Sequence, residues 1–131
     1  MRKFRWLWSA PALALVLAGS AHAGTLATPL MFSGTELISF FCNAVNVAES
    51  PIASVTVKLV PIGVGSIQGS ESTCDNLAPG DVCETGVVAA DPLFFSGHCK
   101  IIFTGSRKSL RGSMVATDGA ENDIRAQVDA E

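Results

Sequence analysis

Four cysteines are the residues of this chain with the most definite chemistry: Cys42, Cys74, Cys83 and Cys99. In an oxidising compartment these four cysteines predict two disulfide bonds, because no cellular reductant keeps the thiols reduced there. The intervals between them, of 31, 8 and 15 residues, contain no Cys-x-x-Cys pair, so a zinc site of cysteine and histidine ligands is disfavoured. We therefore expect the cysteines to be structural.

Four cysteines allow three pairings, and the surroundings of each cysteine distinguish them. Cys42 and Cys99 each lie in the middle of an apolar run, as a bridge between two facing sheets requires, whereas Cys74 and Cys83 flank one turn in polar surroundings. We predict the bonds Cys42–Cys99 and Cys74–Cys83. A regular two-residue hairpin would not place the second pair opposite each other, so that bond needs a bulge or a wider loop.

A basic cluster follows the last cysteine. Arg107, Lys108 and Arg111 lie in and just after a turn that begins at Gly105. Guanidinium and ammonium groups hold anionic groups through charge-assisted hydrogen bonds, so this cluster is the candidate contact with an anionic group on a partner or on a surface glycan. The alternative interpretation is a solvated turn without a ligand.

Two further features carry weaker signals. His98 would serve a hydrolytic site together with a serine and an aspartate, but no Gly-x-Ser-x-Gly turn occurs, and the alternative is an exposed strand histidine. An acidic hairpin crowds oxygen ligands of the kind that calcium prefers, without the spacing of an EF-hand loop, at Asp118, Glu121, Asn122 and Asp123. We therefore predict no catalytic residue, no metal site and no cofactor. A small-ligand or calcium-binding module and, third, a small hydrolase remain as alternatives.

The first 23 residues have the layout of a secretory signal peptide. Arg2, Lys3 and Arg5 precede an apolar run from Trp6 to Ala18, and the small residues of Ala21–Ala23 follow, after which we predict cleavage. The alternative is an uncleaved anchor, but the run is shorter than the roughly 20 apolar residues that cross a bilayer. We expect export to the periplasm or outside the cell, and no membrane span once the signal is removed.

Composition limits the kind of partner. Removing 23 of the 131 residues leaves one domain, residues 24–131, of 108 residues, and three of the nine basic residues leave with the signal. Six basic residues then face twelve acidic ones, a net charge of −6, which disfavours a nucleic acid or an anionic membrane. Both tryptophans also leave and the chain has no tyrosine, so a sugar-binding platform of exposed Trp or Tyr is excluded. The expected partner is a protein or a surface component of unknown identity.

The exported part predicts an antiparallel β-sandwich. Residues 37–47 are apolar on both alternating faces, which is typical of a central strand, and residues 53–60 alternate between apolar and polar side chains. Pro79–Gly80 fit the two central positions of a type II turn. We expect six or seven strands, because turn residues recur between short apolar segments and no 3.6-residue periodicity is present. A small Greek-key barrel is the alternative.

Two stretches are less regular. Residues 24–36 mix turn formers with apolar residues and are expected to supply an edge strand at most. Gly63, Gly65 and Gly69 interrupt residues 62–72, which allows a short strand over 64–68 or a loop with no strand.

Four short motifs occur together: Cys42-Asn-Ala-Val-Asn46, Leu77-Ala-Pro-Gly80, Cys99-Lys-Ile-Ile-Phe103 and Gly105-Ser-Arg-Lys-Ser-Leu-Arg111. In this combination, residues 37–117 resemble a family of uncharacterised small exported bacterial proteins that are all-β and immunoglobulin-like. The resemblance implies a fold and export, and it implies no catalytic residue. Our interpretation of the sequence is a non-catalytic exported β-sandwich that acts through protein contact or as a surface or periplasmic component.

Overall fold

A computed structural model of the chain describes residues 22–32, 38–62, 69–89, 96–118 and 124–131. Within these ranges the protein is all-β and contains one short 3-10 helix and no α-helix. In chain order the elements are β1 (Ala23–Ala27), β2 (Met31–Phe32), β3 (Ile38–Asn46), β4 (Ile52–Ile62), β5 (Ser70–Leu77), β6 (Val82–Ala89), β7 (Ser96–Thr104), η1 (Arg107–Ser109), β8 (Leu110–Asp118) and β9 (Ile124–Asp129).

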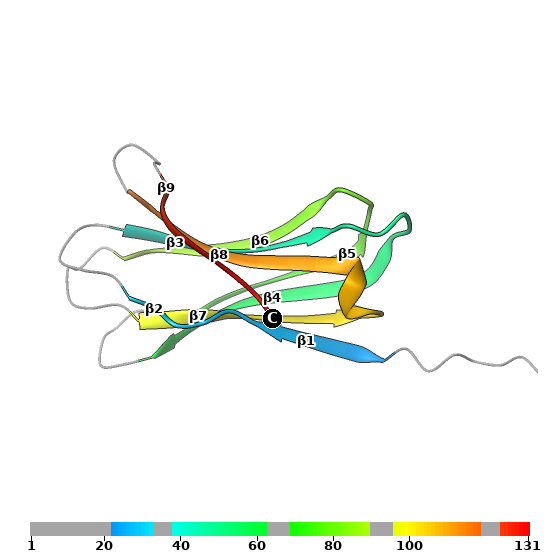
Figure 1. Cartoon of the computed structure of the whole chain (residues 1–131), viewed down its shortest axis with the longest axis horizontal. Coiled ribbons are helices and arrows are strands. Elements are labelled where there is room, and N and C mark those ends of the chain that lie inside the picture. The colour runs from blue at the N-terminus through cyan, green and yellow to red at the C-terminus, as the bar shows by residue number, and fades with distance from the viewer. Residues whose placement is uncertain (1–21, 33–37, 63–68, 90–95, 119–123) are drawn as a thin grey trace, which may run out of the picture.

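The strands form two antiparallel sheets that face each other (Figure 1). Sheet A has the strand order β1-β7-β4-β5, and β2 also pairs with β7; sheet B has the order β6-β3-β8-β9. The expected antiparallel sandwich is therefore confirmed. The described residues contain more strands than the six or seven expected, because β2 is only two residues long and β5 has no apolar pattern by which the sequence would reveal it.

The core lies between the sheets and is built by alternate residues of the central strands. Val55, Val57 and Leu59 of β4 are buried, as the alternation of residues 53–60 predicts, and β3 lies between β6 and β8, as predicted for residues 37–47. The largest fully buried apolar side chains are Phe40, Phe103, Ile101, Leu110, Met114, Val55 and Val57. Each of these side chains comes from a strand that has a neighbouring strand on both sides. There the two facing sheets shield the side chain from water.

Both predicted disulfides are confirmed, and both join sheet A to sheet B. Cys42 of β3 bonds to Cys99 of β7 with a Cα–Cα distance of 5.6 Å, and Cys74 of β5 bonds to Cys83 of β6 at 5.9 Å. The second bond needs neither a bulge nor a wider loop, because β5 and β6 form no hairpin: residues 78–81 cross from one sheet to the other. The polar surroundings expected for this bond are not found at Cys83, which is fully buried. With no free cysteine present, the two bonds indicate an oxidising, non-cytoplasmic location.

The structure also bears on the expected edge strand and on the expected turn. β1 supplies the edge strand expected within residues 24–36, and Gly80 has the positive φ, 82°, that the turn at Pro79–Gly80 requires. The strand considered for residues 64–68 and most of the signal peptide, residues 1–21, lie outside the described residues. No helix in the described part of the chain is both long and apolar enough to cross a membrane.

Candidate functional site

Three connections between the sheets lie at one end of the sandwich, which we call the crossover end (Figure 1). Residues 47–51 lead from β3 to β4, residues 78–81 from β5 to β6, and residues 105–109 from β7 to β8. Each connection passes from one sheet to the other, so the crossover end displays loop residues from three distant parts of the sequence.

The basic cluster begins on η1, in the third of these connections. Gly105, with a φ of 113°, ends β7, and Ser106 then caps a single 3-10 turn. The Ser106 hydroxyl accepts from the Lys108 N–H at 3.3 Å, and the Ser106 carbonyl accepts from the Ser109 N–H at 2.9 Å. Arg107 and Lys108 are therefore exposed on a turn with a defined backbone.

The three predicted cations do not converge on one point. The Arg107 guanidinium donates to the carbonyl oxygen of Thr25 in β1 at 2.9 Å, on the side of sheet A. Arg111 instead lies on the outer face of sheet B, because its neighbours Leu110 and Gly112 point into the core. The structure therefore brings Arg107 and Lys108 together on η1 and places Arg111 on a different face.

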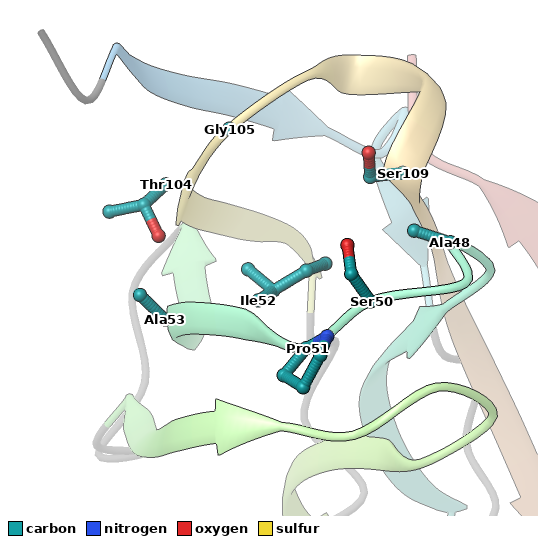
Figure 2. A pocket seen from close by; sticks show the side chains of 8 residues that line it. All are labelled: Ala48, Ser50, Pro51, Ile52, Ala53, Thr104, Gly105 and Ser109. Carbon is teal, nitrogen blue, oxygen red and sulfur yellow. The ribbon is translucent and has the colours of Figure 1, made fainter. Parts of the chain in front are cut away.

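A hollow of about 330 Å³ lies beside η1, open to the surface. Figure 2 shows the chain arching from Thr104 to Ser109 above the first residues of β4, with Ala48 and Ser50 of the loop 47–51 next to Ser109. The lining is mainly apolar and consists of Ala48, Ser50, Pro51, Ile52, Ala53, Thr104, Gly105 and Ser109. The hollow lies where the pairing of β4 with β7 ends: the last pair is Val55 with Phe103, and beyond it the Ser54 N–H donates to the Thr104 hydroxyl at 3.2 Å.

One buried amide holds the crossover end together. Asn46, 1 % exposed at the end of β3, donates through Nδ2 to the carbonyl oxygens of Ser50 at 2.9 Å and Leu77 at 2.8 Å. Its Oδ1 accepts from the Ala48 N–H at 2.9 Å. The amide therefore ties the loop 47–51 to the last residue of β5. Sequence reasoning missed this role, although an amide at an inward-facing position of an apolar strand is a signal for it.

Apolar and acidic residues also reach the surface here. Val47 and Val82 are 48 % and 52 % exposed, and the main chains of the segments that carry them meet, since the Asn46 N–H donates to the Asp81 carbonyl oxygen at 3.1 Å. Glu49 and Asp81 are exposed beside these valines. The crossover end therefore combines apolar surface with charges of both signs.

Among the described residues, His98, which was considered for catalysis, has no catalytic partner. His98 lies half-buried on the outer face of sheet A, opposite Val60 of β4, and no hydrogen bond joins its imidazole to another described residue. No group of three or more His, Cys, Asp or Glu side chains that could hold a metal occurs among the described residues. The acidic hairpin is not tested, because residues 119–123 and the side chain of Asp118 lie outside that part of the chain.

Comparison with known proteins leaves the structure as the main guide to function. No family model matches this chain, and searches of curated proteins and of solved structures give no match either.

Proposed function

We propose that this protein is a non-catalytic, exported β-sandwich that acts by contact with another protein or surface component, through the crossover end. The observation that carries the proposal is the hollow beside η1, because the short 3-10 helix that supplies Ser109 to its lining also carries the exposed cations Arg107 and Lys108. A mainly apolar recess seats a side chain of a partner, and charged residues on a neighbouring turn orient that partner. The partner's chemistry expected at η1 is an anionic group.

Export is part of the same proposal. It is supported by the basic and apolar leader of residues 1–23 and by the two disulfides, which keep a small domain folded in an oxidising compartment. An immunoglobulin-like relationship is supported by Cys42–Cys99, which joins β3 and β7 across the sandwich as the bridge of antibody domains does. β8 departs from that arrangement, since it pairs with β3 and not with β7.

Photo-crosslinking tests the proposal. A photoreactive residue in place of Lys108 is expected to crosslink a partner in the native envelope or medium, and the crosslink should be lost when Arg107 is changed to Ser. The same probe in place of Glu71, on the exposed edge of β5, is the matched control and is expected to give no such product. Equal products from both positions, or substrate turnover by the purified protein without any partner, would overturn the proposal.

A small-ligand module is the second candidate function, because the hollow has a volume at the lower limit of small-molecule sites. Isothermal titration calorimetry with calcium, phosphate and simple sugars tests it. Saturable heat that Ser109→Trp abolishes without lowering the thermal midpoint would support this candidate, because that substitution fills the hollow. The absence of heat with every probe would remove it.

A further inference from the structure

Sheet A has one edge at β5 and the other at β1 and the two-residue β2, and sheet B has edges at β6 and β9. The edge of β1 is closed by the chain itself. The Ala27 N–H donates to the Glu131 carbonyl oxygen at 3.2 Å, and the Glu131 N–H donates to the Ala27 carbonyl oxygen at 3.1 Å. Two residues earlier, Arg107 occupies the Thr25 carbonyl oxygen. These bonds use the main-chain groups through which a further strand would join.

The edges of β5 and β9 are protected in other ways. β5 carries Glu71 and Asp75 on its exposed face, and Asn76 has a φ of 53°, which breaks the extended backbone. β9 has six residues, ends at Asp129, and pairs with β8 through a shift in register. Charged side chains, short length and irregular backbone are the usual means by which an edge avoids pairing.

β6 has none of these protections within the described residues. It is eight residues long, lacks proline, and carries one charge, Glu84. The Asn46 N–H donates to the Asp81 carbonyl oxygen, so the odd-numbered residues that follow bond to β3. Val82, Glu84 and Gly86 therefore turn their N–H and C=O groups to the open side, where the described residues supply no main-chain partner.

The side chains beside this edge leave it accessible. The Asn43 amide, with Nδ2 facing its acceptors, donates to Glu84 Oε2 at 2.7 Å and draws that carboxylate toward β3. The ring of Phe41 lies over Gly86, because a Cβ built on Gly86 would be 2.5 Å from Cδ1 of the ring. The single charge is thus directed away from the open side, and an apolar ring covers the position that has no side chain.

We propose that a second copy of this chain adds its β6 antiparallel to this edge, with the two-fold axis at Thr85, so that sheet B continues across both copies. Only an extended polypeptide backbone matches a row of alternating N–H and C=O groups, and β6 is complementary to itself. With the axis at Thr85, Glu84 faces the partner's Gly86, and the two residues exchange main-chain hydrogen bonds. Thr85 faces the partner's Thr85, a favourable pair of hydroxyl side chains.

The neighbouring registers are worse. An axis at Glu84 would place the two carboxylates directly opposite each other, which is destabilising. An axis at Gly86 would place two glycines at the centre, where no cross-strand side-chain contact forms. An axis between two residues would place the unpaired N–H and C=O groups of one copy opposite residues that already bond to β3 in the other copy.

Sedimentation equilibrium of the oxidised protein tests this pairing. We expect a monomer–dimer equilibrium, and we expect Glu84→Pro to weaken association about 30-fold, because one edge N–H is lost in each copy. Glu84→Gln keeps the N–H and is the control that should associate like the unaltered protein. A strictly monomeric protein, or a dimer that Glu84→Pro leaves unchanged, would overturn the proposal.

Hydrogen exchange keeps the proposal testable even where Glu84→Pro does not fold. In the unaltered protein the amides of Val82, Glu84 and Gly86 should exchange more slowly at high than at low protein concentration. The amide of Thr85, which bonds to β3, should be slow at both. Concentration-independent exchange at the three open amides, or monomers that protect them only when another protein is added, would refute self-pairing.

Discussion

Replacing Asn46 by alanine should lower the free energy of unfolding by about 3 kcal/mol. The substitution removes three hydrogen bonds and leaves their main-chain partners in place. The bond to the Leu77 carbonyl is buried, and an unsatisfied buried acceptor costs about 2 kcal/mol. The bonds to Ser50 and Ala48 are partly buried, so water replaces them and each loss costs about 0.5 kcal/mol.

Urea unfolding of the oxidised protein measures this effect. With a slope of about 1.5 kcal/mol per molar urea, the midpoint should fall by roughly 2 M. The thermal midpoint should fall by roughly 13 °C. The slope itself should stay constant, because the substitution changes the stability of the folded state and not the area exposed on unfolding.

Asn43→Ala is the matched control, since Asn43 lies on the same strand but faces outward and is half-buried. Its loss should cost less than about 1 kcal/mol. Asn46→Asp is a second test, because a carboxylate would face two carbonyl oxygens and its folded-state pKa would rise. That variant should be most stable below the ordinary aspartate pKa and should lose stability as the pH rises through the raised value. Equal effects of Asn43→Ala and Asn46→Ala would refute the role assigned to the buried amide.

Three further predictions concern the core and the turns. Replacing Cys42 and Cys99 together by serine should cost roughly 4 kcal/mol, because that bond closes a loop with a sequence separation of 57, and a melting curve should show a larger loss than for the shorter bridge. Gly112→Ala should cost roughly 1–3 kcal/mol in urea unfolding, because its Cβ would lie 2.1 Å from Cδ1 of the fully buried Ile101. Gly105→Ala should cost about 1 kcal/mol through backbone strain alone, since φ is 113° and no atom lies near the new methyl group; a neutral thermal melt would contradict this.

The inward-facing residues of the central strands were predictable, because packing between two sheets requires an apolar residue at every second position of a strand. Val55, Val57 and Leu59 show that period directly, and the apolar neighbours of Cys42 and Cys99 identified a bond across the core. β5 was not predictable in this way. Both of its faces are largely polar, since it lies at an edge where water replaces one neighbour, and only its last residue, Leu77, is buried.

The basic residues of the candidate site were predictable by type but not by direction. Arg107 and Arg111 are four residues apart in the sequence, yet the chain changes sheets between them, so they face different surfaces. The hollow had no signal in the sequence, because its walls come from residues 48–53 and 104–109, which are far apart in the sequence and adjacent only in the fold. The role of Asn46 was missed, although an amide at an inward-facing position of an apolar strand is a signal for it.

The open edge of β6 shows what a strand pattern leaves out. Alternation reports which face of a strand is buried, but it does not report how many strands lie beside it, because main-chain hydrogen bonds do not depend on side-chain type. β6 has a largely apolar sequence, and on its pattern alone it would suit the middle of a sheet as well as an edge. In the structure β6 has one neighbouring strand, β3, so it carries more apolar residues than an edge strand exposed to water requires. A polar edge such as β5 needs no partner for its outer side, whereas β6 reaches the environment that its composition suits only when a second strand lies beside it.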